Sequence, residues 1–172
     1  MPVHVHRLQE VKQVRLIAWM LLGILIGPAS AAPSWVYQSG VPATDAIEIS
    51  KEPGRVAIGD RGYEARFCSA TGFSCFRSEV LSFAVPASVE NVKSWRDGSL
   101  LYKVIGSRQL EFMGKQTRVL LIRMSPASPK DHAPVFWYSP AHGLVAIAET
   151  EGRGTHLLRV QGRCGFPQAQ CR

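Results

Sequence analysis

The chain lacks the short motifs that most often identify an enzyme. No serine lies in a Gly-x-Ser-x-Gly turn, and none precedes a lysine at the spacing of an acyl-serine enzyme. Glycine-rich loops that cradle phosphate are also absent, and glycines such as Gly72 and Gly98 occur singly, where a turn explains them. Catalysis by a Ser and His pair and phosphate binding by a glycine loop therefore have no support.

The chain also lacks an apolar run long enough to cross a membrane, which takes about 20 residues. Its longest uncharged apolar run has 12 residues, 16–27, and follows Arg7, Lys12 and Arg15. The small-residue segment Ser30-Ala31-Ala32 comes shortly after it. A basic region, a short apolar region and a small-residue site together predict a secretory signal peptide, residues 1–31, cleaved after Ala31. An uncleaved membrane anchor is the alternative.

No cysteine directly follows the apolar run, so a lipid-modified amino terminus is not indicated. The expected mature protein, residues 32–172, is a single domain without a transmembrane segment, in the periplasm or secreted. It has 17 Lys and Arg against 12 Asp and Glu, a net charge of +5. The basic residues are spread along the chain, whereas a nucleic-acid footprint concentrates them. Nucleic acid is therefore not an expected partner.

The cysteines lie in two pairs, Cys68 with Cys75 and Cys164 with Cys171. Each pair has six residues between its members and carries a Gly and a Phe inside. In an exported chain an even cysteine count predicts disulfides, and the equal spacings favour these two local loops, although four cysteines allow three connectivities. Zinc is the less favoured alternative, because its paired ligands usually have two to four residues between them.

The mature chain has no stretch with helical spacing of apolar residues. Short apolar and β-branched runs alternate instead with Gly, Pro and Asp breakers, and the Asp97-Gly98 turn and the segment 134–163 indicate a hairpin and a three-strand meander. About nine strands are expected, with separate strands at 99–105 and 109–113 and a single strand at 63–67. The fold class is all-β: an antiparallel meander forming a sandwich or a curved half-barrel.

Six large aromatic side chains could line a groove for sugars or lipid chains: Trp35, Tyr37, Trp95, Tyr102, Trp137 and Tyr138. The candidate ligand-binding residues are Trp95, Tyr102, Trp137 and the turn histidine His142. The competing interpretation, that the aromatic residues pack the sheet, is favoured. The segment 125–134 contains three prolines and is the candidate lid. His132, His142 and His156 are not spaced as metal ligands, with His156 expected near Glu149, so no metal or cofactor is predicted.

The run Trp137-Tyr-Ser-Pro-Ala-His-Gly-Leu-Val145 resembles a W-Y-x-P-x-x-G-L-V hairpin of small uncharacterised bacterial envelope proteins. Some of these look like the curved half-barrels of lipoprotein carriers. The resemblance covers the carboxyl half of the chain and implies a sheet that ends in this turn. It supplies no catalytic residue.

The sequence therefore predicts an exported envelope protein that acts as a binding or structural module, without chemistry of its own. A carrier of a lipid or another apolar ligand is the alternative. Its expected signature is a cavity lined by Trp95, Tyr102 and Trp137. A hydrolase is the second alternative, and it requires His142 or His156 within hydrogen-bonding distance of a serine or a carboxylate.

Overall fold

The computed structural model describes residues 32–39, 46–68, 72–125, 133–151 and 154–169. The chain divides into two units, Met1–Ala31 and Ala32–Arg172. The first unit, which corresponds to the predicted signal peptide, lies outside the described residues. Within these ranges no helix has the length and apolar character needed to cross a membrane.

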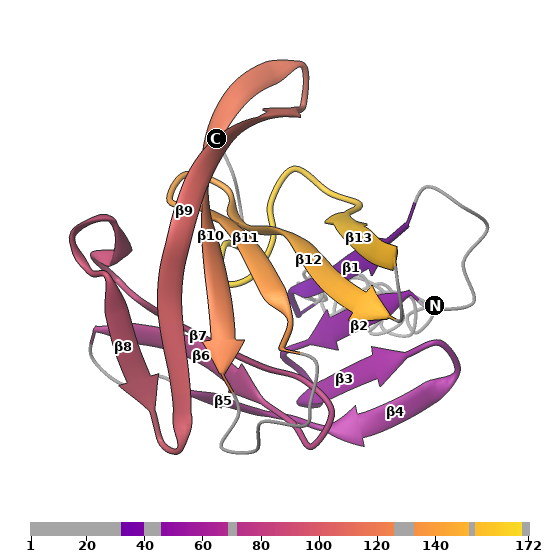
Figure 1. The fold of residues 1–172 in the computed structure, drawn as a ribbon. Helices are drawn as coiled ribbons and strands as arrows, with labels where there is room; N and C mark the ends of the chain where they lie inside the picture. The colour runs from indigo at the N-terminus through magenta and orange to yellow at the C-terminus, as the bar shows by residue number, and fades with distance from the viewer. Residues whose placement is uncertain (1–31, 40–45, 69–71, 126–132, 152–153, 170–172) are drawn as a thin grey trace, which may run out of the picture. The chain divides into compact units, whose positions relative to one another are not determined.

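The regular secondary structure in the described part of the second unit is almost entirely β-strand, which confirms the predicted fold class (Figure 1). A single 3-10 turn, η1 (Val89–Asn91), interrupts the strands. The strands are β1 (Ser34–Gln38), β2 (Ile47–Ser50), β3 (Arg55–Ile58), β4 (Arg61–Glu64), β5 (Arg66–Cys68), β6 (Phe73–Arg77), β7 (Ser82–Pro86), β8 (Ser94–Asp97), β9 (Leu100–Phe112), β10 (Lys115–Ser125), β11 (Val135–Ser139), β12 (Gly143–Glu151) and β13 (Gly154–Val160).

Ten strands form one antiparallel sheet, in the order β4-β3-β2-β1-β13-β12-β11-β10-β9-β8. The sheet consists of two meanders that meet where the first and last strands pair, with Tyr37 opposite Val160. It stays open, because β4 and β8 are its two edges. The β1–β13 pairing brings the start of the domain beside the segment that follows β13. These two segments form the site described below.

The remaining strands form a small antiparallel sheet, β5-β6-β7. Cys68 and Cys75 face each other across β5 and β6 and form a disulfide, with 5.2 Å between their Cα atoms. The first predicted pairing is thereby confirmed. Cys171 lies outside the described residues, so the pairing of Cys164 with Cys171 stays a prediction.

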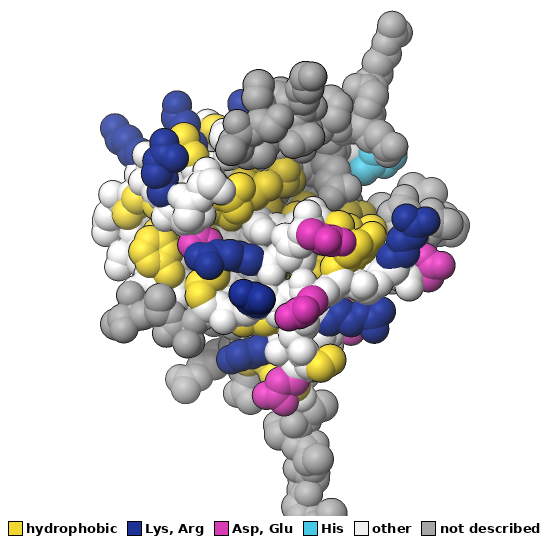
Figure 2. All heavy atoms as spheres, turned by 90° about the horizontal axis from the view of Figure 1, so that it is seen from below, with side chains coloured by type: hydrophobic (Ala, Val, Ile, Leu, Met, Phe, Trp, Pro, Cys, Tyr) yellow, Lys and Arg dark blue, Asp and Glu magenta, His cyan; other side chains and the backbone are white. Residues whose placement is uncertain are grey.

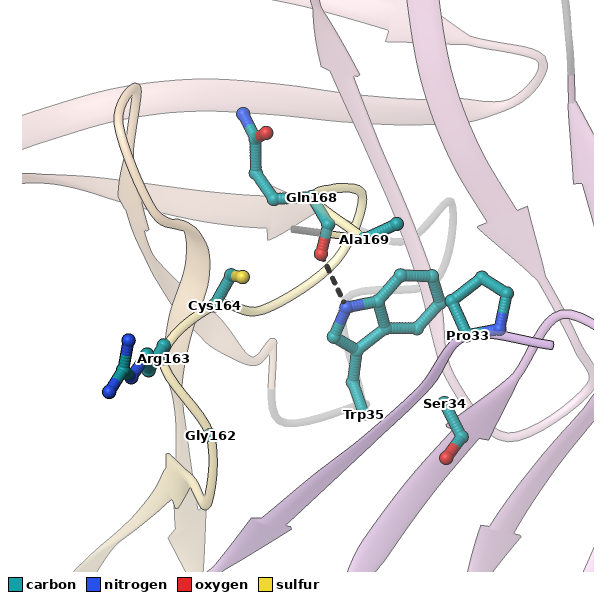
Figure 3. A pocket seen from close by; sticks show the side chains of 8 residues that line it. All are labelled: Pro33, Ser34, Trp35, Gly162, Arg163, Cys164, Gln168 and Ala169. Carbon is teal, nitrogen blue, oxygen red and sulfur yellow. Dashed lines mark hydrogen bonds between the residues drawn. The ribbon is translucent and has the colours of Figure 1, made fainter. Parts of the chain in front are cut away.

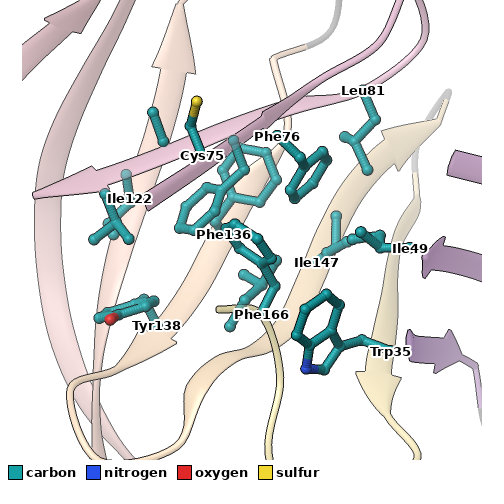
Figure 4. Close-up of a cluster of buried hydrophobic side chains, with 14 of the residues drawn as sticks. Trp35, Ile49, Cys75, Phe76, Leu81, Ile122, Phe136, Tyr138, Ile147 and Phe166 are labelled. Carbon is teal, nitrogen blue, oxygen red and sulfur yellow. The ribbon is translucent and has the colours of Figure 1, made fainter. Parts of the chain in front are cut away.

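The core fills the space between the two sheets (Figure 4). Across the large sheet, Ile122 lies opposite Phe136, and Phe136 lies opposite Ile147, all fully buried. The small sheet contributes the fully buried Phe76 and Phe83, and the rings of Phe83 and Phe136 lie 4.7 Å apart. Each fully buried Phe stabilises the fold by about 1.5–3 kcal/mol through loss of apolar surface from water. Side chains of both sheets therefore occupy the concave face.

Three of the expected strands differ from the structure. The runs 99–105 and 109–113 form one strand, β9, because a β-bulge opposite Leu121 and Ile122 absorbs the irregularity at Gly106. The expected strand 63–67 is divided at Ala65, whose N–H donates to the Gly54 carbonyl at 2.8 Å. The chain leaves the large sheet at that residue and enters the small one. The strand count is therefore thirteen in the described part of the chain, against about nine expected.

Side chains also connect the small sheet to β8. The Trp95 indole N–H donates to the carbonyl of Ala84 on β7 at 2.9 Å. The guanidinium of Arg77 on β6 forms an ion pair with Asp97, and the hydrogen bond from Arg77 to this carboxylate raises the Arg77 pKa. The side chain of Arg77 is half exposed, so solvent screens this pair and it contributes little to stability. The hydrogen bond from the Trp95 indole contributes more to the stability of this connection than the ion pair does, since it is buried.

Candidate functional site

The predicted ligand-binding aromatics lie on opposite faces of the large sheet. Trp95 and Tyr102 stack with 5.7 Å between ring centroids and are both buried in the core. Phe136 and Tyr138 point into the same core, so Trp137 between them points to the other face. On that face Trp137 packs against Arg108, whose guanidinium carbon lies 4.9 Å from the centroid of the Trp137 ring. The described residues therefore form no single cavity lined by Trp95, Tyr102 and Trp137. Ligand binding by any one of them stays a prediction.

The predicted binding residue His142 lies in the turn between β11 and β12, where its ring contacts Phe112 at a centroid distance of 5.2 Å. Its Nδ1 is buried and has no hydrogen-bond partner among the described residues. His156 is exposed on β13 and lies opposite Glu149 in the strand register, as predicted. His132 and most of the candidate lid, 126–132, lie outside the described residues. No group of three or more possible metal ligands occurs in the ranges that the structure describes.

The segment Cys164–Gln168, which follows β13, is bound to the large sheet by a set of hydrogen bonds. The Gly165 N–H donates to the His142 carbonyl, and the Leu144 N–H donates to the Phe166 carbonyl, both at 2.8 Å. The buried Tyr37 hydroxyl accepts from the Phe166 N–H and donates to the Leu144 carbonyl, each at 3.1 Å. Tyr37 therefore joins β1, β12 and this segment through one oxygen.

Phe166 is the apolar anchor of the same segment. Only 4% of its surface is exposed, and its ring contacts Trp35 and Phe76 edge-on, with centroids 5.2 and 5.1 Å away. The rings of Phe67 and Phe83 lie 5.9 and 6.3 Å from it. Edge-to-face pairs of this kind add about 0.5–1.5 kcal/mol to the burial of each ring. Phe166 is thus part of the core although it follows the last strand.

Two adjoining cavities lie beside this segment. The first, of about 500 Å³, is lined by Pro33, Ser34, Trp35, Gly162, Arg163, Cys164, Gln168 and Ala169 (Figure 3). The second, of about 290 Å³, is lined by Pro33, Trp35, Lys51, Phe67, Cys68, Phe73, Ser74, Cys75, Phe166, Pro167 and Ala169. Because Pro33, Trp35 and Ala169 line both, we treat the cavities as one site and call it the Trp35 groove.

The Trp35 side chain is held in place between these cavities. Its indole N–H donates to the Gln168 carbonyl at 2.9 Å, as Figure 3 shows, and Ile49 lies opposite Trp35 in the neighbouring strand. The ring thus has its polar atom satisfied, and only 5% of the residue's surface is exposed. Phe73 lies at the second cavity with 37% of its surface exposed. The groove therefore combines fixed aromatic walls with one accessible aromatic side chain.

A third cavity, of about 320 Å³, shares Ser74 and Pro167 with the second cavity and Gln168 with the first. Its lining is mostly polar and includes Ser88, Glu90 and Asn91, and it reaches the Tyr138 ring. It differs in chemistry from the Trp35 groove, whose walls are aromatic.

Comparisons with known proteins do not identify a relative. No family model matches the sequence, and neither the curated proteins nor the solved structures contain a match. The function must therefore be argued from the geometry of this chain.

Trp35 was a candidate groove residue at the level of sequence, whereas Phe67, Phe73 and Phe166 were missed, although one signal pointed to two of them. Each cysteine segment carries one phenylalanine, and these two residues, Phe73 and Phe166, line the same cavity. The sequence shows the two segments as similar in spacing but far apart in the chain. Only the β1–β13 pairing and the packing of the small sheet bring them together.

Burial also predicts how the protein responds to alkaline conditions. It raises the pKa of Tyr37, Tyr102 and Tyr138, and for Tyr102 the nearby Asp97 carboxylate adds to this effect. The contribution of these neutral tyrosines to stability is fully present below about pH 10, the pKa of tyrosine in the unfolded chain. It is lost as the pH rises above that value, because the tyrosines then ionise in the unfolded chain but not in the folded one. Tyr37 and Tyr102 each lower the free energy of unfolding by about 1.4 kcal/mol per pH unit above that value, and Tyr138 acts in the same direction.

Urea unfolding between about pH 9 and pH 11 measures this slope. The variant Tyr102→Phe should reduce the slope and leave neutral-pH stability nearly unchanged, because the Tyr102 hydroxyl has no hydrogen-bond partner among the described residues. A slope that is the same in Tyr102→Phe and in the wild type would contradict the prediction.

Proposed function

We propose that this chain is an exported, non-catalytic binding module whose mature form starts at Ala32 and binds an apolar ligand in the Trp35 groove. Export is supported by the basic, apolar and small-residue parts of residues 1–31. The Cys68–Cys75 disulfide is consistent with an oxidising compartment, such as the periplasm. The mass of the protein recovered from the envelope fraction tests export, since loss of residues 1–31 starts the chain at Ala32.

The observation that carries the binding proposal is the position of Phe73. This side chain is one of the few large apolar residues exposed in the described part of the chain, and it lies at the cavity walled by Trp35, Phe67 and Phe166. An exposed apolar side chain at a concave aromatic site is typical of ligand-binding sites, because the ligand removes the remaining apolar surface from water. In the folded protein without a ligand, that apolar surface stays exposed to water.

The concave face of the large sheet is an inferior candidate for the binding site. Phe76, Phe83 and Phe136 fill it with rings that contact one another. A carrier that held its ligand there would have to displace this core. The Trp35 groove lies at the margin of the same core and accepts a ligand without displacing it.

A neutral fluorescent apolar probe, N-phenylnaphthylamine, tests the proposal. We expect its emission to rise on binding to the mature protein, and the variant Phe73→Ser to weaken binding by about tenfold, the equivalent of 1.4 kcal/mol. Val80→Ser is the matched control, because Val80 is exposed to a similar extent, 39% against 37%, and lines none of the three cavities.

Equal loss of affinity in the two variants would show that the probe does not use the groove. No binding by the folded protein would remove the proposal and favour a purely structural component of the envelope.

A further inference from the structure

The charged residues of the Trp35 groove all have the same sign. Lys51 lines the second cavity and Arg163 lines the first, and no carboxylate is present among the described residues that line either cavity. On the face shown in Figure 2, by contrast, Lys and Arg side chains alternate with Asp and Glu. The groove therefore departs from the mixed charge of that face.

Both cations sit on backbone that the fold positions. Lys51 follows β2, and its N–H donates to the carbonyl of Pro33, a groove residue, at 3.2 Å. Arg163 directly precedes Cys164, within the segment that follows β13. Its side chain lies at the edge of the first cavity, and in the view of Figure 3 its guanidinium is directed away from Trp35.

Neither cation is neutralised by the protein within the described ranges. The ion pair found there joins Arg77 to Asp97, and neither Lys51 nor Arg163 takes part in it. Both side chains are exposed, so a ligand can reach them. Lys and Arg bind carboxylates and phosphates through charge-assisted hydrogen bonds, and Arg can do so with two parallel bonds.

From this arrangement we infer that the ligand of the Trp35 groove is a single-chain amphiphile with an anionic head group, of the fatty-acid class. The inference rests on the proposed function, since it names the ligand of the same groove. The hydrocarbon chain of the ligand packs against Trp35, Phe67 and Phe73, and its anionic head group binds Lys51 or Arg163 at the margin of the groove. A cationic amphiphile is repelled at that position, and a neutral one gains only the apolar contacts.

Displacement of N-phenylnaphthylamine by decanoate and by decanol tests the inference, because these two ligands have equal chain lengths and differ in charge. Partition into a merely apolar site favours the neutral decanol. We therefore expect decanoate to displace the probe at a concentration about tenfold lower than decanol, which is the strength of one charge-assisted hydrogen bond.

The double variant Lys51→Gln/Arg163→Gln should lose this preference and bind the probe and decanol as before. The control Lys103→Gln/Arg123→Gln removes the same charge from a cross-strand pair of β9 and β10, outside the groove, and should keep the preference.

The outcomes separate the inference from the proposal on which it rests. If the probe binds but decanol displaces it at the same concentration as decanoate does, the site is merely apolar and the inference of an anionic head group is wrong. If the probe does not bind, the proposed function itself fails. Binding to vesicles of phosphatidylglycerol without displacement by decanoate would point to a membrane surface and overturn the inference.

Discussion

Replacing Phe166 with alanine is expected to lower the free energy of unfolding by about 3–5 kcal/mol, the usual cost of removing a buried aromatic ring. The loss is expected to be this large because Phe166 contacts four other aromatic rings and is almost fully buried. Three of these rings, Phe67, Phe76 and Phe83, belong to the small sheet, and Trp35 belongs to the large one. The ring therefore lies where the two sheets and the carboxyl-terminal segment meet.

Urea unfolding of the purified variant measures this effect. Phe73→Ala is the matched control, because it removes the same ring from the same cavity at an exposed position, and it should cost less than about 1 kcal/mol. Equal costs for the two variants would show that Phe166 is not packed into the core in solution. A variant that fails to fold at all is consistent with the prediction only if Phe73→Ala folds normally.

The sequence was sufficient to predict those parts of the fold that depend on local patterns. The Asp97-Gly98 turn predicted the β8–β9 hairpin, and the aromatic and β-branched runs of 134–163 predicted β11, β12 and β13. Equal spacing predicted the Cys68–Cys75 disulfide. In each case neighbouring residues determine the structure, since turn chemistry and side-chain alternation act over a few residues.

The candidate site could not be predicted in this way. It depends on the pairing of Tyr37 with Val160, which joins residues at opposite ends of the domain and has no local signal. Alternation showed that Trp137 must point away from Phe136 and Tyr138, but it could not show which face is the core. The segment after Cys164 contains no strand pattern, so the burial of Phe166 could not be anticipated.

Replacing Gly165 with alanine should separate the carboxyl-terminal segment from the large sheet. A Cβ atom at Gly165 would lie 1.7 Å from the Leu144 carbonyl oxygen and 2.8 Å from the Tyr37 hydroxyl. The first of these atoms belongs to the backbone of β12 and cannot move aside without breaking strand pairing. We expect a loss of about 3 kcal/mol or more in the free energy of unfolding, because a steric clash of this kind is added to the loss of hydrogen bonds around Tyr37.

Gly162→Ala is the matched control for stability, since Gly162 lies three residues before Gly165 and a Cβ there would have the Cys164 carbonyl oxygen as its nearest neighbour, at 3.7 Å. It should leave stability within about 0.5 kcal/mol of the wild type. Because Gly165 and Phe166 hold the segment that forms one wall of the Trp35 groove, Gly165→Ala should also weaken binding of N-phenylnaphthylamine. A Gly165→Ala protein with wild-type stability and wild-type probe binding would show that this segment does not occupy the position described. The groove as defined here would then not exist in solution.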